Sequence, residues 1–399
     1  MSELFYPHGG GAELSTYLYA YLLSRADFNV IVLTNRFSRE PEVSKNGNLT
    51  TYRLPLFKEN ESAKYSTLKR FDVLFSSLVR KIMKWADCIY VPRFWYSAIP
   101  LAKAYGKPVI THLHDYIPIC PLSNIYDLSK DAVCNKNSLL CPPKCIYAYG
   151  KKHGAGLSET LSSTALNLTV GRCFGKLVEL SDAVICVSKV HRDMITKNEP
   201  SLFDKTCVIY NPLPELSCME IEGDDFGYFG GPNCLKGFSA LYHAMVNIKD
   251  SNLRLKIQAT RFPDRKEKLV KLLKGLGFVL HGKLDKDEYE KLYRKIRSVI
   301  VPSLWHEPWP YVVVEAIIRG RFVIASRIGG IPEQVDGCES AMLCEPNNPQ
   351  QLTEAIEFVN SLNRENITEL GLKSREVFLN KFSNETTIRR FISICEHLT

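Results

Sequence analysis

The 399-residue sequence contains no long apolar run, no internal repeat and no low-complexity tract. No stretch approaches the roughly 20 apolar residues that a bilayer-spanning helix needs. The start, MSELFYPHGGG, has neither the basic flank nor the apolar segment of a signal peptide, so we expect a cytoplasmic protein. Positive charge is only slightly in excess, with 51 Lys and Arg against 43 Asp and Glu. This balance suggests an anionic partner, such as phosphate groups or the inner face of a membrane, and no recognisable module supports nucleic-acid binding.

Short β-branched or aromatic runs alternate with helix-period stretches from end to end, which predicts an α/β protein with parallel sheets covered by helices. Ten strands are too many for one small sheet, so we expect two doubly wound domains. A Pro-rich, acidic connector near residue 200 divides them into domains 1–198 and 199–379, with a terminal helix over 380–399 that packs back on the first. The expected strands are 29–34, 88–92, 108–112, 183–188, 207–210, 226–229, 254–258, 277–281, 298–301 and 322–326.

The strongest local signal is the segment from Glu307 to Glu315, EPWPYVVVE. Its prolines forbid helix before them, and Pro310 or Tyr311 is a good first helical position, so Glu307 belongs to a loop and Glu315 to the second helical turn. Two carboxylates around a helix start suit the binding of sugar hydroxyl groups and of a phosphate. The alternative is a pair of solvated surface acids.

Two glycine-rich turns precede expected helices. The first, FGYFGGPNCLKG, ends at Lys236 and Gly237 and has the strand, turn and lysine order of a phosphate-binding loop without the Walker spacing. The second, HGGGAE, spans residues 8–13 and allows close approach of a backbone to a ligand. An exposed lysine at a helix start and an ordinary flexible turn are the respective alternatives.

The segment THLHDY follows an apolar strand, and alternation places His112 and His114 on the same side. Ligands bind at the carboxyl ends of strands in open α/β sheets. Such a triplet orients a substrate or satisfies a core hydrogen bond more often than it binds a metal.

In the order GGGAE, HDY, VSK, YNPLP, GG-x4-KG, E-x7-E and GGIPE, these motifs resemble a family-four glycosyltransferase of GT-B architecture. The resemblance covers nearly the whole chain. It implies two Rossmann-like domains facing a central cleft, and a retaining transferase that uses a nucleotide-sugar donor, a UDP- or GDP-sugar. The acceptor would be a glycan hydroxyl, free or lipid-linked, held mostly by the N-terminal domain. No cofactor and no divalent metal would be needed for catalysis.

The resemblance also implies roles for individual residues. Glu315 would hold the ribose hydroxyls, Glu307 the hydroxyls of the donor sugar, and Lys236 would neutralise the diphosphate. His114 would meet the sugar near its 6-hydroxyl, so His114, Lys236 and Glu307 are the expected catalytic residues. The expected donor-binding residues are Gly10, Gly11, Gly230, Gly231, Arg261, Gly282, Pro310, Tyr311, Val312 and Glu315.

The sequence departs from the family pattern in two places. Gly231 stands where the pattern has an arginine, and Arg261 at the end of the next strand is the expected substitute. The first strand is shorter than the family's, so its pairing in the N-terminal sheet is expected to be incomplete.

Four of the 13 cysteines, Cys120, Cys134, Cys141 and Cys145, cluster in a Pro-containing loop after the HDY strand. Their spacing is looser than that of a zinc ribbon, and similar insertions occur in part of the family. A structural zinc, one or two disulfides, and free thiols are the alternatives.

Residues 64–85 combine an apolar face at Phe71, Leu74, Leu78 and Ile82 with surrounding lysines and arginines. Such a helix could make peripheral contact with an anionic membrane, although packing on the sheet is favoured. Two other functions remain as alternatives to the transferase: a GT-B nucleotide-sugar epimerase, and a non-catalytic nucleotide-sugar-binding protein, which the missing arginine at Gly231 would favour.

Overall fold

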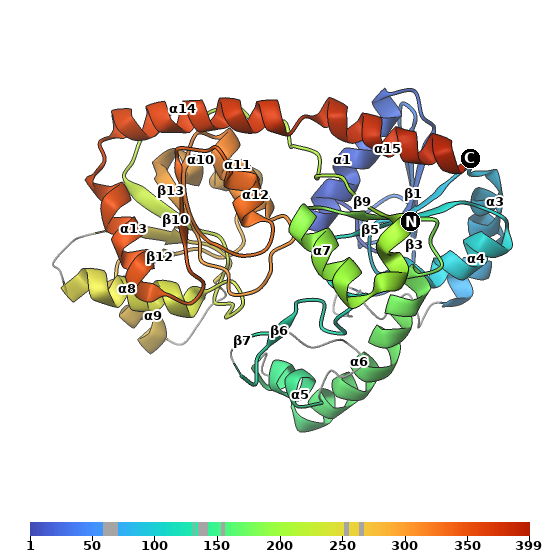
Figure 1. Cartoon of the computed structure of the whole chain (residues 1–399), viewed down its shortest axis with the longest axis horizontal. Helices are drawn as coiled ribbons and strands as arrows, with labels where there is room; N and C mark the ends of the chain where they lie inside the picture. The colour runs from blue at the N-terminus through green and yellow to red at the C-terminus, as the bar shows by residue number, and fades with distance from the viewer. Residues whose placement is uncertain (59–70, 131, 135–142, 153–155, 251–254, 263–266) are drawn as a thin grey trace. The chain divides into compact units, whose positions relative to one another are not determined.

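The computed structural model describes the chain except residues 59–70, 131, 135–142, 153–155, 251–254 and 263–266. The chain forms two compact units (Figure 1): unit 1 comprises Met1–Leu213 and Phe382–Thr399, and unit 2 comprises Pro214–Lys381. The expected boundary after residue 198 therefore moves to residue 213. The reason is that β9 (Thr206–Val208) pairs with β8 (Ala183–Cys186) and so completes a sheet of unit 1.

Unit 2 is built on one parallel sheet with the strand order β12-β11-β10-β13-β14-β15. If the six strands are numbered 1 to 6 along the chain, their order in the sheet is 3-2-1-4-5-6, as in a Rossmann-like fold. The order of the strands reverses between β10 and β13, which is the switch point of the sheet. The strands are β10 (Asp225–Tyr228), β11 (Ile257–Ala259), β12 (Phe278–Leu280), β13 (Ile296–Val301), β14 (Phe322–Ser326) and β15 (Ala341–Cys344).

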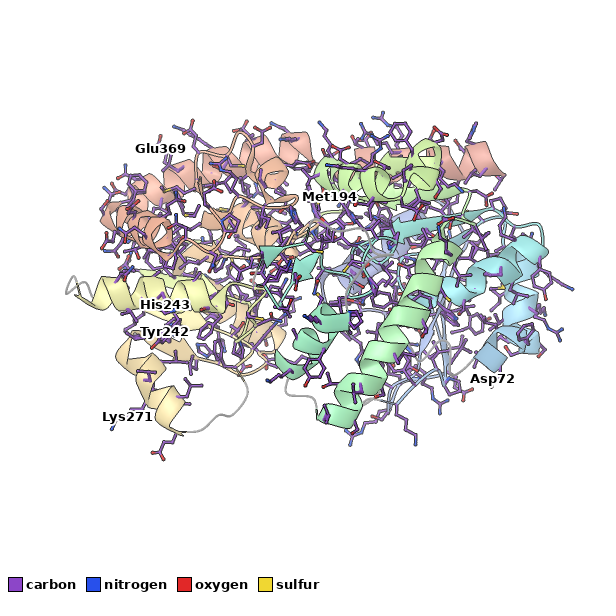
Figure 2. The ribbon with its side chains drawn as sticks, turned by 60° about the horizontal axis from the view of Figure 1, so that its bottom comes forward. Asp72, Met194, Tyr242, His243, Lys271 and Glu369 are labelled. Carbon is purple, nitrogen blue, oxygen red and sulfur yellow. The ribbon has the colours of Figure 1, made fainter. Side chains whose placement is uncertain are left out.

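Helices cover this sheet because its strands are mostly apolar and largely buried, as in parallel sheets covered on both faces. All six residues of β13 are buried. Phe226, Leu241 and Ile356 share one buried cluster that joins β10, α8 and α13. The helices are α8 (Phe238–Asp250), α9 (Glu267–Gly275), α10 (Lys286–Lys295), α11 (Tyr311–Ile318), α12 (Ile331–Val335), α13 (Pro349–Ser361) and α14 (Arg364–Lys381). Their outer surfaces carry charged side chains such as Lys271 and Glu369 (Figure 2).

Unit 1 contains a parallel sheet of order β4-β5-β8-β9 and a second sheet of order β1-β3-β2, in which only β2 is antiparallel. A small hairpin pairs β6 with β7. The remaining strands are β1 (Val30–Asn35), β2 (Val43–Asn46), β3 (Leu49–Leu54), β4 (Ile89–Val91), β5 (Val109–Leu113), β6 (Tyr126–Asp127) and β7 (Ala132–Val133).

The helices of unit 1 are α1 (Gly11–Arg25), α3 (Ser77–Trp85), α4 (Ala98–Ala104), α5 (Pro143–Lys152), α6 (Leu157–Val178), α7 (Lys189–Asn198) and α15 (Asn384–Leu398). Among the described residues, 3-10 segments precede α3 and α4 and follow α7: Phe71–Phe75, Trp95–Ser97 and Pro200–Lys205. The terminal helix α15 packs on unit 1 through Ile388 and Phe391, whose ring centroid lies 5.2 Å from that of Tyr19.

The basic helix expected over 64–85 differs in the structure. Residues 64–70 lie outside the described residues, and α3 begins only at Ser77, because the Ser76 hydroxyl caps it by accepting a 3.3 Å hydrogen bond from the Val79 amide. Val79 and Met83, rather than Leu78 and Ile82, form its buried face. Within the described residues, no helix has the length and apolar character needed to cross a bilayer.

A glycine on α14 sets how closely that helix approaches the end of α11. A Cβ at Gly371 would lie 2.3 Å from the carbonyl oxygen of Gly320. We therefore expect Gly371→Ala to lower the free energy of unfolding by about 1–3 kcal/mol, as overpacking does. Denaturant titration checks this, with Gly275→Ala as the control, because a Cβ there meets no atom within 4 Å. Equal stability of the two variants would contradict the close contact.

Candidate functional site

Two loops leave the sheet of unit 2 at its switch point, one after β10 and one after β13, and they are fastened to each other. The Leu304 amide donates a 2.9 Å hydrogen bond to the Leu235 carbonyl. Gly237 has φ +75°, and a Cβ there would lie 1.7 Å from the carbonyl oxygen of Pro302. Only glycine fits this crossing, which brings the predicted phosphate-binding loop against the loop of Glu307.

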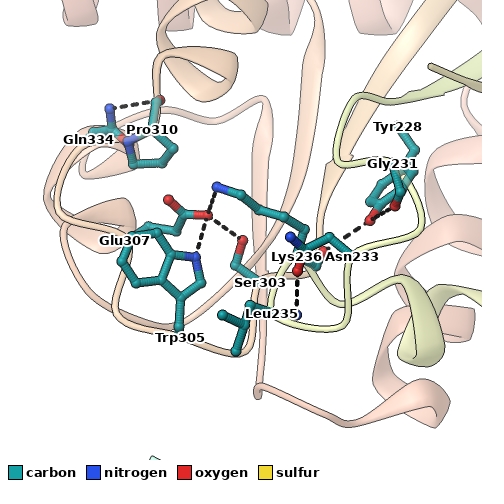
Figure 3. Close-up of polar contacts among 10 residues, drawn as sticks. All are labelled: Tyr228, Gly231, Asn233, Leu235, Lys236, Ser303, Trp305, Glu307, Pro310 and Gln334. Carbon is teal, nitrogen blue, oxygen red and sulfur yellow. Dashed lines mark hydrogen bonds and ion pairs between the residues drawn. The ribbon is translucent and has the colours of Figure 1, made fainter. Parts of the chain in front are cut away.

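The carboxylate of Glu307 is buried and receives three hydrogen bonds on the same oxygen (Figure 3). Its Oε1 accepts from Lys236 Nζ at 2.6 Å, from Ser303 Oγ at 2.8 Å and from Trp305 Nε1 at 2.9 Å. None of these three donors bonds to the other carboxylate oxygen, Oε2. The charge of Glu307 is thus neutralised on one side, and its second oxygen is the one placed to accept from hydroxyl groups of a ligand.

The GGIPE motif holds the backbone of Glu307. The Gly330 amide donates to the Glu307 carbonyl at 2.8 Å. Gly329 has φ +59°, and a Cβ on it would lie 2.3 Å from the same oxygen. The GGIPE motif was recognised from the sequence as part of the family pattern, but no role was predicted for it. In the structure it supports the loop that carries Glu307.

Lys236 is the cation of this cluster. Its ammonium lies between the Glu307 carboxylate and the Trp305 ring, 5.3 Å from the ring centroid. The Lys236 side chain is 38% exposed, whereas that of Glu307 is 5% exposed. The ammonium is therefore fixed from one side and remains open to an anion from the other.

The helix α11 begins next to this cluster. Pro310 is its N-cap residue and supplies no side-chain cap. The buried Gln334 side chain donates to the Pro310 carbonyl at 3.3 Å (Figure 3) and so fixes the chain just before Tyr311 and Val312. First-turn amides without a capping side chain favour the binding of an anion.

Glu315 lies one turn further along α11 in a different environment. Its Oε2 accepts a 2.9 Å hydrogen bond from Tyr289 and lies 4.0 Å from Arg319. Burial raises the pKa of Glu315, and the positive charges of Arg319 and Arg261 oppose this rise. Arg319 is itself buried, 4.4 Å from the Tyr293 ring centroid and paired with Glu290.

The expected substitute cation, Arg261, lies beside the position that lacks the arginine. A Cβ on Gly231 would lie 3.0 Å from the Arg261 carbonyl, and the Arg261 amide donates to the Gly282 carbonyl at 3.0 Å. Gly230 lies in the same loop, where a Cβ would lie 2.5 Å from the Tyr228 hydroxyl. The structure therefore brings the ends of β10, β11 and β12 together around Gly231, Arg261 and Gly282.

His114 belongs to unit 1 and follows β5. Its ring lies 4.3 Å from that of His112, which pairs with the Tyr90 hydroxyl at 2.7 Å. Burial lowers the pKa of His114 well below its usual value and that of His112 to about 3, so both rings are neutral at pH 7. Within the described part of the chain, the buried Nε2 of His114 has no hydrogen-bond partner, as expected of a ring nitrogen that receives a ligand.

The glycine turn of unit 1 is held by a carboxylate. The Gly10 amide donates to Glu13 Oε2 at 2.6 Å, just before α1 begins at Gly11. Glu13 pairs with Arg93, whose Nε lies 3.4 Å from Glu3 Oε1. Burial raises the pKa of Glu3 to about 7. This turn is therefore ordered through a buried network of charged groups.

The cysteine cluster is only partly described, because Cys141 lies outside the described residues. The Cys134 amide donates to the Ile125 carbonyl at 2.9 Å, and Cys145 Sγ to the carbonyl of the next residue, Tyr126, at 3.7 Å. Among the described residues, no three His, Cys, Asp or Glu side chains are grouped to hold a metal ion. The zinc and disulfide alternatives stay predictions.

Several residues of the site were missed from the sequence: Ser303, Trp305, Tyr289, Arg319 and Gln334. Arg319 had a detectable signal, because it follows Glu315 by one helical turn. Tyr289 and Gln334 come from α10 and α12, and no spacing along the sequence connects them with α11.

Taken together, unit 2 presents an ammonium, a guanidinium and an uncapped helix start beside two acidic side chains. The cations and the helix start suit a phosphate, and the carboxylates suit hydroxyl groups. This is the chemistry of a site for a phosphorylated, hydroxyl-rich ligand.

Comparisons with known proteins agree with this chemistry. The family model of glycosyltransferase family 4 matches residues 9–214, and that of group 1 glycosyl transferases matches residues 223–360. An uncharacterized glycosyltransferase of Methanocaldococcus jannaschii is 30% identical over 306 residues, which cover 73% of this chain and 84% of that protein.

Solved structures share the fold at low sequence identity. Sucrose-phosphate synthase of Thermosynechococcus elongatus has a TM-score of 0.69 at 16% identity, covering 98% of this chain and 94% of its own. HepE of Anabaena in complex with UDP-glucose has a TM-score of 0.63 at 15% identity, covering 100% and 99%. The sequence resemblance is thereby confirmed, and the chain belongs to glycosyltransferase family 4 and is a glycosyltransferase of GT-B fold.

Proposed function

We propose that this glycosyltransferase is a retaining hexosyltransferase that moves a sugar from a UDP- or GDP-sugar to a hydroxyl acceptor. The observation that carries the proposal is the cluster in which Lys236 and Glu307 meet at the switch point of the unit 2 sheet. Relatives add support: the HepE structure contains UDP-glucose, and a Salmonella relative that is 28% identical over 172 residues is a lipopolysaccharide N-acetylglucosaminetransferase.

In this proposal, unit 2 binds the donor. Lys236, Arg261 and the amides at Tyr311 and Val312 receive the diphosphate, and Gly230 and Gly231 let it approach the backbone. Glu315 accepts from the ribose hydroxyls, Gly282 lies by the base, and the Glu307 carboxylate accepts from the sugar hydroxyls. The assignment of Glu315 fits a carboxyl already shared with Tyr289, because a second hydroxyl donor then meets a preorganised acceptor.

The reaction breaks the bond between the anomeric carbon and the phosphate oxygen, and the diphosphate leaves with the electron pair. The acceptor hydroxyl oxygen bonds to the anomeric carbon on the same face, and its proton passes to the departing phosphate. Lys236, Arg261 and the α11 start stabilise the negative charge that grows on the leaving group, so they take the place that a divalent metal fills elsewhere. The family resemblance further assigns His114 to the sugar and the turn at Gly10 and Gly11 to the phosphates.

The acceptor is proposed to be a glycan hydroxyl, and a lipid-linked form matches the exposed basic residues of α3. Arg80, Lys81 and Lys84 are all exposed there and suit an anionic membrane at the cytoplasmic face. The epimerase and the non-catalytic binder are not favoured, since the named relatives are glycosyltransferases and the Arg261 backbone lies next to Gly231, from where its side chain is proposed to replace the missing arginine.

Donor binding tests the proposal first. We expect one class among UDP-, GDP- and ADP-sugars to raise the thermal midpoint, since a ligand at 100 times its Kd stabilises by about 2.7 kcal/mol. The measurement is a thermal shift panel without added Mg²⁺ or Mn²⁺, followed by an assay of donor hydrolysis. Stabilisation without any hydrolysis or transfer would instead support a binding protein, and no stabilisation by any nucleotide sugar would contradict the site.

Substitutions at the cluster test the residues. We expect Glu307→Gln and Lys236→Ala each to lower kcat at least about 100-fold, as the loss of one preorganised charge contact does. Circular dichroism and the thermal midpoint show whether the fold persists. Lys271→Ala on the exposed face of α9 is the matched control and should keep full turnover. Near-normal turnover in either cluster variant removes that residue from the site.

We also propose that Cys120, Cys134, Cys141 and Cys145 hold a structural zinc once the metal is present; this proposal rests on their clustering in the sequence. We expect one zinc per purified chain by elemental analysis, and less in Cys134→Ser. Alkylation followed by mass measurement distinguishes the alternatives: blocked thiols without zinc indicate disulfides, and four reactive thiols without zinc indicate free cysteines.

A further inference from the structure

Arg319 is a buried cation with no role in the proposed donor contacts. It is the C-cap residue of α11, and its side chain is only 3% exposed. Its Nη2 pairs with Glu290, but within the described part of the chain its buried Nε and Nη1 have no hydrogen-bond partner. Burying a guanidinium with unpaired N–H groups costs free energy, which an apolar side chain of similar size would avoid. A charge kept in this way is typical of a functional site.

The carboxylate of Glu315 lies next to this cation. The two residues are four positions apart along α11 and therefore lie on the same face of the helix. Arg319 Nη1 is 4.0 Å from Glu315 Oε2, which is too long for a hydrogen bond but short enough for a strong interaction between largely buried charges. The Tyr289 hydroxyl donates to the same oxygen at 2.9 Å. Both partners thus act on Oε2, and Oε1 is the oxygen placed to accept from a ligand.

The protonation of Glu315 decides how well it binds hydroxyl groups. A carboxylate accepts hydrogen bonds on both oxygens, whereas a protonated carboxyl uses one oxygen as a donor. Burial raises the pKa of Glu315 and so favours the protonated form. Among the effects that oppose this rise, the positive charge of Arg319 is the largest, followed by the hydrogen bond from Tyr289.

The other charged and titratable groups around this pair come from α10 and from the loop after β11. On α10, burial raises the pKa of both Tyr289 and Tyr293, so these hydroxyls are neutral at pH 7. Glu290, also on α10, raises the pKa of Glu315, but its side chain is 35% exposed, so water screens its charge. The loop after β11 contributes Arg261, whose positive charge has the opposite effect.

We propose that Arg319 is a positioning residue that keeps the Glu315 carboxylate ionised and its Oε1 directed to the donor, without contacting the donor itself. This inference rests on the proposed role of Glu315 in accepting hydrogen bonds from the ribose hydroxyls. Its consequence is that donor binding does not change with pH around neutrality, although the carboxyl group that binds the ribose is largely buried.

The test measures the Kd of UDP-glucose, with GDP-mannose as a second probe, for the full chain at several pH values. Neither sugar diphosphate gains or loses a proton in the range tested. We expect the wild-type Kd to be constant from about pH 6 to about pH 8.5. In Arg319→Met, which removes the charge and keeps a long apolar side chain, we expect the Kd to be at least about tenfold higher at the acidic end, because only the ionised fraction of Glu315 binds well.

Four variants separate this effect from a general structural role. Arg319→Lys restores the charge and should restore a constant Kd, and Glu290→Gln, the matched control, removes the other partner of Arg319 and should leave the Kd constant. The double variant Glu315→Gln, Arg319→Met should bind weakly at every pH. Arg319→Gln is a second neutral variant if circular dichroism shows that Arg319→Met does not fold. In the neutral variants, the donor KM should rise by a larger factor than kcat falls.

Three results would overturn the proposal. The first is a loss of affinity in the neutral variants that is equal at every pH. The second is a pH dependence of Arg319→Met that persists after Glu315→Gln is added. The third is an Arg319→Lys variant that is as sensitive to pH as Arg319→Met.

A measurement on the free chain separates this inference from the proposed function. With isotope-labelled glutamate carboxyl carbons, the magnetic resonance signal missing from Glu315→Gln belongs to Glu315. We expect this signal to shift over the tested pH range in Arg319→Met and to stay constant in the wild type. The same behaviour in both proteins would overturn the role of Arg319. A wild-type chain that binds no nucleotide sugar would instead contradict the proposed function, and the signal of Glu315 would still decide whether Arg319 keeps it ionised.

Discussion

The buried carboxylate of Glu307 is the charge on which the arrangement of unit 2 depends. A carboxylate removed from water costs several kcal/mol unless it is paired and hydrogen-bonded. Lys236, Ser303 and Trp305 meet this demand together on Oε1. Because one of these donors comes from the loop after β10 and two from the loop after β13, satisfying the charge also fixes the two loops against each other. The backbone at Gly237 and Gly329 also approaches neighbouring backbone so closely that only glycine fits, which fixes the positions of both loops.

The same arrangement explains how one site can offer a cation to a phosphate and carboxylates to hydroxyl groups. Lys236 is held from its buried side and open on the other, so an anion can approach it without the carboxylate being stripped of its partners. The environment of Glu315 is different: burial raises its pKa, and the Arg319 guanidinium at 4.0 Å and the hydrogen bond from Tyr289 oppose that rise. Two carboxylates eight residues apart thus differ in environment, as groups with different tasks do.

Unit 1 contains a second network of buried ionisable groups. In it, Arg93 pairs with Glu3 and Glu13, and Glu13 accepts a hydrogen bond from the Gly10 amide. The neutral pair of His112 and His114 lies at the end of β5, where burial disfavours a charged ring. In both units, polar side chains proposed to contact the ligand lie near the carboxyl ends of parallel strands, where a rigid sheet supports the loops.

The sequence by itself determined the class of fold, ten of the strands, the family and the loops that carry Lys236, Glu307 and Glu315. These follow from local patterns: apolar alternation, proline and glycine positions, and motif order. The strands β2, β3, β6, β7 and β15 were missed: β2, β6, β7 and β15 have four residues or fewer, and β3, LTTYRL, mixes polar with apolar side chains. Only the tertiary structure decided that Tyr289 and Gln334 support the site and that the division falls at residue 213. Those contacts join elements distant in sequence, and packing rather than spacing selects them.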